Sequence, residues 1–252
     1  MNRHTKKKKQ KKEYIYGHHA VAEALAHAPG AIKTVFISHT STHRNEIQAL
    51  AQKAGVPIKQ LGSDTKTRRT EDDTSHQGVV AEFTSGGLLQ PYKDFITNLE
   101  ITPQTAVIIL GELNDPHNVG AIIRNAAAFG VAGVLIPDHN QAPITGTVVK
   151  VSAGMAFRVP LVHIGNINTT VRDLKDRGFW VYGLDMDGHT STATENYDRA
   201  SAFIVGNESD GLRTKTHELC DSILSIPIDP RCESLNAAVS AGIVMYSWYT
   251  KQ

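Results

Sequence analysis

The feature that most restricts the fold is a set of short apolar runs that alternate with helix-like segments from residue 105 onward. The first run, Ala106-Val-Ile-Ile-Leu110, is apolar without interruption, which is typical of a strand buried on both faces of a sheet. Residues 118–129 follow with apolar side chains on one side of a helix. Strand-like runs then occur at 133–136, 160–162, 180–184, 202–205 and 223–228, and helix-like segments at 145–153, 167–177, 214–220 and 235–249. This alternation predicts an α/β fold with a mostly parallel sheet and helices on both faces.

In the preceding part of the chain, strand-like and helix-like segments also alternate, but each segment is shorter. A helix is expected within residues 14–25 and another at 43–54, and the strand-like segments lie at 32–38, 57–61 and 78–83. Residues 13–83 therefore predict a small α/β domain. Residues 84–103 contain Gly86-Gly87, Pro91 and Pro103, which indicates a linker between this domain and a second one at 104–252.

The charge of the chain is concentrated at its start. Residues 1–12 hold seven Lys and Arg and no acid, so the other residues carry 19 basic and 25 acidic side chains, a formal charge of −6. We expect 1–12 to be a disordered basic tail that attracts polyanions such as RNA through its charge. A tail that only increases solubility is the alternative.

Several classes of protein are disfavoured by what the chain lacks. No apolar run approaches the roughly 20 residues that span a bilayer, and no apolar stretch follows the basic start as in a secretory signal. Cys220 and Cys232 have no metal-ligand spacing, which favours reduced thiols in a cytoplasmic protein. The twelve histidines include no zinc-binding pair, so no metal is expected.

Phosphate-binding glycine motifs are absent as well. None of the twenty glycines forms a G-x-G pair and no G-x-x-x-x-G-K-[ST] occurs, which argues against dinucleotide-binding domains and P-loop enzymes. A glycine-rich turn of the kind that Rossmann methyltransferases carry is also missing after the first long strand. That position holds Gly111-Glu-Leu-Asn-Asp-Pro-His-Asn-Val-Gly120 instead.

Three polar clusters stand out beside these strands and helices. They are Asp115-Pro-His-Asn118-Val-Gly-Ala-Ile-Ile-Arg124, Val205-Gly-Asn-Glu208-Ser-Asp-Gly211-Leu, and Ile226-Pro-Ile followed by Ser234-Leu-Asn236. Each has an ordinary structural explanation on its own: a helix cap, a solvated arginine, or a tight turn. Asn236 is harder to explain by helix propensity.

Taken together and in this order, the three clusters resemble the SpoU family of RNA 2′-O-methyltransferases in the SPOUT superfamily. The resemblance covers residues 105–250. Residues 13–83 resemble the substrate-binding domain of the ribosomal RNA members, in Ile15-Tyr-Gly-His-His-Ala-Val and His76-Gln-Gly-Val-Val-Ala81. The resemblance implies a SPOUT domain with a deep C-terminal trefoil knot, a homodimer, and S-adenosylmethionine as cofactor. It also implies methylation of a guanosine ribose in large-subunit (23S) ribosomal RNA.

The resemblance further assigns the site residues by their place in the motifs. The catalytic residues would be Asn118, Arg124, Glu208, Ser234 and Asn236. Gly206, Ile226 and Leu235 would hold the cofactor, largely through backbone groups. Ala237-Ala238 follows Asn236 where relatives often carry Val-Ser, which removes a hydroxyl near the site but leaves the motif intact.

The chemistry fits these residue types. A sulfonium methyl group is already activated, so the difficult partner is the ribose hydroxyl, which must lose its proton. Arginine keeps its proton above pH ~12, so we expect Arg124 to fix the target phosphate and stabilise the developing alkoxide rather than act as a base. Asn118, Ser234 and Asn236 would orient it, and Glu208 would hold it or the knot loop.

Two alternatives remain open from the sequence. One is a transfer RNA 2′-O-methyltransferase, although such members usually carry shorter extensions than residues 13–83. The other is a noncatalytic RNA-binding or ribosome-assembly factor with the same fold.

Overall fold

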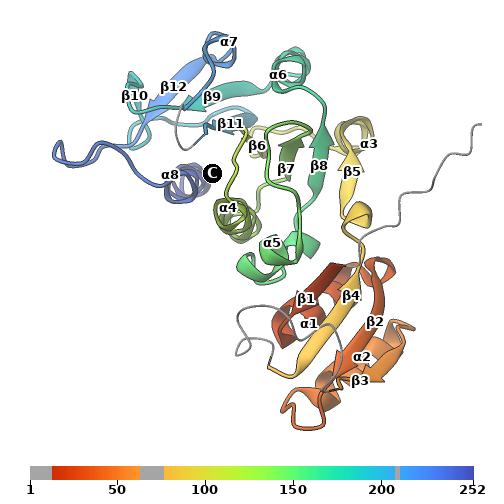
Figure 1. Cartoon of the computed structure of the whole chain (residues 1–252). Coiled ribbons are helices and arrows are strands. Elements are labelled where there is room, and N and C mark those ends of the chain that lie inside the picture. The colour runs from red at the N-terminus through yellow and green to blue at the C-terminus, as the bar shows by residue number, and fades with distance from the viewer. Residues whose placement is uncertain (1–12, 63–76, 208–210) are drawn as a thin grey trace, which may run out of the picture.

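A computed structural model describes residues 13–62, 77–207 and 211–252 (Figure 1). The basic tail at 1–12, residues 63–76, and Glu208 lie outside the described residues. The chain forms two α/β units, each built on its own sheet.

The N-terminal unit is a four-stranded sheet in the order β1-β4-β2-β3 with two helices. Its elements are β1 (Glu13–Tyr16), α1 (His18–His27), β2 (Ile32–Ile37), α2 (Arg44–Lys53), β3 (Ile58–Gln60) and β4 (Val79–Phe83). β4 runs antiparallel to both neighbours, whereas β3 runs parallel to β2. Residues 13–16 form a strand rather than the start of a helix, because Ile15 is fully buried while Tyr14 and Tyr16 on either side of it are only partly covered.

The C-terminal unit is an eight-stranded sheet in the order β10-β12-β9-β11-β6-β7-β8-β5, and every neighbouring pair is parallel. Its strands are β5 (Leu89–Pro91), β6 (Ala106–Leu110), β7 (Gly133–Pro137), β8 (Leu161–Ile164), β9 (Trp180–Leu184), β10 (Thr190–Ser191), β11 (Ser201–Val205) and β12 (Ser222–Ser225). Its helices are α3 (Tyr92–Asn98), α4 (Pro116–Ala128), α5 (Gly146–Val151), α6 (Ile167–Asp176), α7 (Thr214–His217) and α8 (Ala237–Tyr249). The predicted α/β class with a parallel sheet is confirmed.

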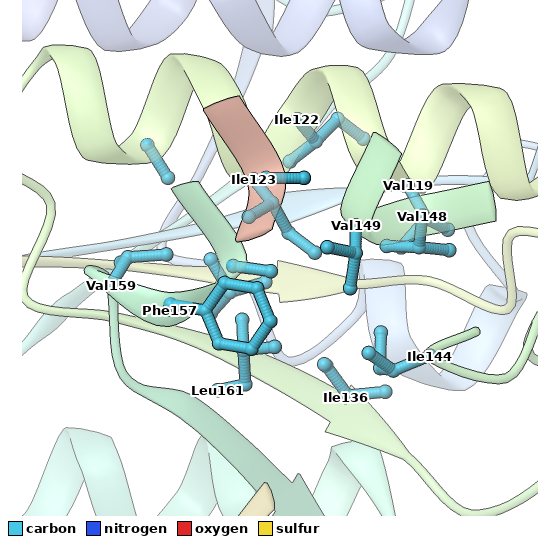
Figure 2. Close-up of a cluster of buried hydrophobic side chains, with 14 of the residues drawn as sticks. Val119, Ile122, Ile123, Ile136, Ile144, Val148, Val149, Phe157, Val159 and Leu161 are labelled. Atoms are coloured by element: carbon cyan, nitrogen blue, oxygen red, sulfur yellow. The ribbon is translucent and has the colours of Figure 1, made fainter. Parts of the chain in front are cut away.

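Helices cover both faces of this sheet, and its central strands β11, β6 and β7 are therefore buried at every position. Along β6, Ile108 packs toward α4, α5 and α8, whereas the neighbouring Ile109 packs toward α3 and α6. Figure 2 shows the first of these faces, where Ile122 and Ile123 of α4 lie above the side chains of the sheet. Continuous apolar runs therefore mark the strands of this unit, as the sequence predicted.

The segment 84–103 differs from the linker that its glycines and prolines indicate. It contains β5, which extends the large sheet by pairing with β8, and α3, whose Phe95 and Ile96 are buried against the sheet. Proline is tolerated in β5 because this strand forms the edge of the sheet. The sequence analysis missed β5 because it has only three residues and lies among glycines and a proline.

The two units are in direct contact through α5 and the turn after it. A Cβ on Gly146 would lie 2.0 Å from the carbonyl oxygen of Tyr14, so the backbones of α5 and β1 touch there. The Arg158 guanidinium donates hydrogen bonds of 2.5 and 2.8 Å to the two carboxylate oxygens of Glu23 in α1. The N-terminal unit therefore packs directly against the C-terminal unit.

The C-terminal end of the chain folds back over the segment that follows β10. Ser247 of α8 donates a 2.6 Å hydrogen bond to the carbonyl of Thr192, and Lys251 donates to the carbonyl of Ala193 at 2.9 Å. A Cβ on Gly188 would lie 2.6 Å from the backbone of Leu224 in β12. The deep trefoil knot implied by the resemblance stays a prediction.

Candidate functional site

Three loops meet at one edge of the large sheet, where the parallel strands end. Gly206 follows β11, Asp185 follows β9, and Ile226 follows β12. These three strands are neighbours, so their carboxyl ends lie side by side. In open α/β sheets, ligands bind at such a carboxyl edge.

The loops enclose a cavity of about 560 Å³ beside the start of α8. Its lining consists of Leu184, Asp185, Met186, Asp187, Val205, Gly206, Asn207, Gly211, Glu233, Ser234, Leu235, Asn236, Ala237 and Ser240. An adjoining hollow shares several of these residues and adds Ile226, Ile228 and Cys232. Five of the residues predicted from the motifs thus line one continuous region: Gly206, Ile226, Ser234, Leu235 and Asn236.

Asn236 connects this cavity to α4. It is the N-cap of α8, and its Oδ1 accepts hydrogen bonds from the backbone N–H of Ala238 at 2.9 Å and of Val239 at 3.3 Å. Its Nδ2 donates a 2.9 Å hydrogen bond to Oδ1 of Asn118, which is buried in the first turn of α4. The first and third motifs are therefore joined by one amide pair.

The first motif is held in place by the way α4 begins. Asp115 caps the helix by accepting a 2.8 Å hydrogen bond from the backbone N–H of His117, and Pro116 occupies the first helical position. Gly120 allows a close approach to α5, since a Cβ there would lie 2.7 Å from the side chain of Val151. These local features fix the position of Asn118.

Arg124 does not join the amide pair within this chain. It is exposed on α4. Six helical positions separate it from Asn118, which places the two side chains about 120° apart around the helix. Asn125, seven positions on, returns to the side of Asn118 and donates a 3.5 Å hydrogen bond to the carbonyl of Ala238 in α8.

Glu208, the remaining predicted catalytic residue, lies outside the described residues. On either side of the undescribed residues, Asn207 and Gly211 exchange backbone hydrogen bonds of 2.9 and 3.1 Å. A Cβ on Gly206 would lie 2.6 Å from the backbone of Gly211, so only glycine fits there. Gly211 has a φ of 62°, in the left-handed region that favours glycine.

The sequence analysis missed one wall of the cavity. Asp185, Met186 and Asp187 follow β9, and Asp185 is anchored by its backbone N–H, which donates to the carbonyl of Leu224 at 3.1 Å. Met186 is 60% exposed, which is unusual for a methionine and leaves an apolar surface at the cavity. The sequence Leu184-Asp-Met-Asp-Gly188 directly after a predicted strand could have indicated this loop.

The cavity suits a cofactor bound mainly by backbone groups. Gly206 and Gly188 both sit where a side chain would collide with neighbouring backbone, so the loops pack closely around the cavity. Asp185, Asp187 and Glu233 supply carboxylates at its rim, which favour a cationic ligand such as a sulfonium. Within the described parts of the chain, no group of three metal-ligating side chains occurs.

A second cavity of about 590 Å³ lies near the same loop, and none of the described predicted site residues lines it. It is bordered by Glu112, which has a φ of 65°, and by Arg213, whose guanidinium donates hydrogen bonds of 2.6 and 2.9 Å to Oε2 of Glu112. Asn207 donates a 2.7 Å hydrogen bond to the carbonyl of Glu112. These bonds tie the loop after β6 to the loop after β11.

Comparison with known proteins identifies the two units. Residues 105–246 match the SpoU rRNA Methylase family, and residues 14–86 match a family described as RNA 2'-O ribose methyltransferase substrate binding. The 23S rRNA (guanosine-2'-O-)-methyltransferase RlmB of Neisseria meningitidis is 35% identical over 92% of each chain. The RlmB of Nitrosomonas europaea is 32% identical over 94% of this chain and 91% of its own.

A solved structure has the same fold. The SpoU methyltransferase AviRb from Streptomyces viridochromogenes, in complex with the cofactor AdoMet, aligns with a TM-score of 0.78 at 22% identity. The alignment covers 95% of this chain and 90% of that chain. It supports the arrangement of both units.

The fold and the matched domains define an RNA methyltransferase that uses S-adenosylmethionine. More narrowly, the chain belongs to the SpoU rRNA methylase family. The family predicted from the three motifs, the enzyme class and the cofactor are thereby confirmed. The roles of individual residues stay predictions.

Proposed function

We propose that this protein transfers a methyl group from S-adenosylmethionine to the ribose 2′-hydroxyl of a guanosine in 23S ribosomal RNA. The observation that carries the proposal is the amide pair of Asn118 and Asn236 beside the three-loop cavity. The similarity to RlmB proteins over more than nine-tenths of the chain supports the guanosine of 23S rRNA as target. The N-terminal match to a substrate-binding family supports RNA as partner.

The loops after β9, β11 and β12 would hold the cofactor, with Gly206, Ile226 and Leu235 in contact with it. When bound, S-adenosylmethionine supplies an activated methyl group. Asn118 and Asn236 would fix the position of the ribose, since an amide pair held by a helix cap has little freedom. Ser234, exposed at the cavity, would donate to or accept from the ribose hydroxyl.

Arg124 would serve the site of a second copy of the chain. Its side chain points away from Asn118 around α4, and it is exposed. A guanidinium there would bind the target phosphate and stabilise the developing alkoxide of the site in the partner subunit. The predicted homodimer would thus be required for the reaction.

The surface of α8 supports this homodimer. None of the 13 residues of α8 is charged, and a helix that is apolar on every side is normally covered on every side. Yet Val239 is 49% exposed, Tyr246 57% and Tyr249 54%. Tyr246 and Tyr249 both lie 5.9 Å from Phe129 at the end of α4, so the exposed apolar surface extends to the helix that carries Arg124.

The substrate is tested by mapping 2′-O-methylation across 23S rRNA in cells with and without the gene. One guanosine should lose its methyl group in the deletion strain and regain it with the wild-type gene but not with Asn236→Ala. Loss of a transfer RNA methyl group with 23S rRNA unchanged would refute the proposed target. Unchanged methylation everywhere would favour a noncatalytic assembly factor.

The shared site is tested by mixing two inactive variants, Arg124→Ala and Asn236→Ala, in one co-expressed preparation. If Arg124 acts on the partner's site, each mixed dimer has one intact site, and random mixing should restore about a quarter of the wild-type rate. If Arg124 acts on its own subunit, no mixed dimer has an intact site and the rate stays at zero. Light scattering on the same samples reports whether a dimer forms.

We also propose a cytoplasmic location. It is supported by Cys220 and Cys232, which form no disulfide. Among the described residues no helix is both long and apolar enough to cross a membrane. The basic tail at 1–12 would add salt-dependent affinity for RNA without choosing the nucleotide. Its deletion should flatten the salt dependence of RNA binding while the methylated guanosine stays the same.

A further inference from the structure

Three histidine rings are in contact at one end of the N-terminal unit. His18 and His19 begin α1, and His43 precedes α2. The rings of His18 and His43 are stacked with centroids 3.5 Å apart and planes 3° apart, and the ring of His19 lies 3.8 Å from His18 at 39°. Two rings this close cannot share one face of His18 without colliding, so they enclose it from opposite sides. We call His18, His19 and His43 the imidazole stack.

The imidazole stack is held by the loops around it. Nδ1 of His18, a side chain only 8% exposed, is hydrogen-bonded to Oε1 of Gln77. The hydroxyl of Ser41 donates a 3.0 Å hydrogen bond to the carbonyl of Gln77. A Cβ on Gly78 would lie 2.9 Å from that of Ser41, so the loop that carries His43 rests against the backbone before β4.

Neither packing nor metal binding accounts for this arrangement. The core of the unit is aliphatic and lies elsewhere, around Ile15, Val35 and Ala81. The rings of His18 and His43 hold their nitrogens in separate parallel planes, and Nδ1 of His18 is already hydrogen-bonded to Gln77, so these lone pairs do not converge on one ion. In the parts of the chain that the structure describes, no three side chains form a metal-ligating group. His19 is exposed and the side chain of His43 is 32% exposed, with Oε2 of Glu46 lying 3.6 Å from Nδ1 of His43.

We propose that the imidazole stack is a binding site for an unpaired base of the RNA substrate. Single-stranded RNA is recognised by stacking of its bases on aromatic side chains, histidine included, and a stack that ends in an exposed ring face offers the next position to a base. The match of residues 14–86 to a substrate-binding family points to RNA as the occupant. This inference rests on the proposed function, because it assumes that RNA is the substrate.

Hydrogen-bonding groups suited to a ribose and phosphate lie beside the stack. Arg44, next to His43, has its Nη1 3.2 Å from Nδ1 of His39. The hydroxyls of Ser38 and Thr40 lie 2.9 Å apart in the same exposed loop. Arginine and hydroxyl side chains commonly contact the backbone of a bound nucleic acid. The base would therefore stack on His43 while its backbone runs along residues 38–44.

Stacking would also supply RNA affinity that does not depend on attraction between the protein and the phosphates. Outside residues 1–12 the chain is formally at −6, so phosphate contacts alone give weak binding to RNA at physiological salt. A stacking contact involves no release of counterions. It therefore persists at salt concentrations that remove the contribution of the basic tail.

The test is binding of the full-length protein to a 23S rRNA transcript in ~0.3 M salt, where tail contacts are largely screened. Replacing His43 with Ala should weaken binding about tenfold, the loss expected for one stacked base. His43→Phe keeps a ring face and should bind within about twofold of wild type. His27→Ala, in the last turn of the same helix α1, is the matched control and should bind like wild type.

Methyl-transfer kinetics separate this site from the catalytic one. His43→Ala should raise the KM for RNA about tenfold and leave kcat and the affinity for S-adenosylmethionine unchanged. The inference is overturned if His43→Ala binds like wild type, or if His43→Phe binds as weakly as His43→Ala. Failure of the proposed function looks different: wild-type protein would then leave 23S rRNA unmethylated, whatever the substitutions do to RNA binding.

Discussion

Asn236 has two hydrogen-bonding tasks, and two substitutions separate them. Its Oδ1 caps α8 through the N–H groups of Ala238 and Val239, and its Nδ2 donates to Asn118. Alanine removes both interactions. Aspartate keeps an oxygen for the cap but has no donor for Asn118. Comparing Asn236→Ala with Asn236→Asp therefore distinguishes the capping role from the proposed catalytic role.

The magnitudes follow from the two interactions. Loss of an asparagine N-cap costs about 1 kcal/mol, and loss of one amide–amide hydrogen bond about another 1 kcal/mol. Asn236→Ala should thus lower the free energy of unfolding by about 2 kcal/mol, or the Tm by about 4–8 °C in a chain of this size. In Asn236→Asp, a carboxylate at the start of α8 regains about 0.3–1 kcal/mol from the helix dipole. Its stability should lie within about 0.7 kcal/mol of wild type.

Both variants should lose methyl transfer, because neither can orient Asn118. The assays are thermal unfolding by circular dichroism at pH 7 and single-turnover methylation of 23S rRNA. Asn166→Ala is a matched control: Asn166 caps α6 with a 3.1 Å bond from the N–H of Thr169, so this variant should lose about 1 kcal/mol and keep activity. An Asn236→Asp protein as unstable as Asn236→Ala would refute the cap argument, and one that turns over normally would refute the orienting role.

Three further predictions concern the cavity and the domain contact. Gly206→Ala places a Cβ 2.6 Å from the backbone of Gly211 and should abolish calorimetric binding of S-adenosylmethionine, so retained affinity would show that this turn is adaptable. At pH 8, iodoacetamide should alkylate exposed Cys232 and spare Cys220, because burial and then Asp221 raise the pKa of the Cys220 thiol to about 12. The cofactor should slow the labelling of Cys232 in peptide mass spectra, and equal labelling of both thiols would contradict the argument. Gly146→Ala should separate the two units, seen as a larger radius of gyration in X-ray scattering with cofactor affinity unchanged; an unchanged radius would mean that the contact gives way locally.

The strands of the large sheet could be predicted because burial on both faces leaves a clear trace. Ala106–Leu110 is apolar at all five positions, and all five are buried. β5 left no such trace: its three residues are only partly covered or exposed, and one of them is proline. β1 was missed for a related reason, since a four-residue strand with one buried side chain has too little pattern to compete with the helix that follows it.

The order of the strands could not be read from local pattern. β11 lies between β9 and β6, although about ninety residues separate it from β6 in sequence, and only tertiary packing decides that placement. The same limit applies to the site. The motifs indicated Asn118 and Asn236, but their mutual hydrogen bond joins residues on α4 and α8. That Arg124 faces away from this pair follows from which side of α4 is covered by α8.

The pairing of β5 with β8 changes what the connection between the two units can do. Leu89 lies opposite Leu161, so the chain enters the large sheet only six residues after β4 ends. With Arg158 bound to Glu23 as a second link, the N-terminal unit is held at a fixed distance from the candidate cofactor cavity. Removing one residue between β4 and β5 would have to shift a strand register or break the contact at Gly146. An RNA substrate must therefore place its target guanosine at a fixed distance from the feature that the N-terminal unit binds. RNA folded into another geometry would be rejected even though the protein recognises none of its bases.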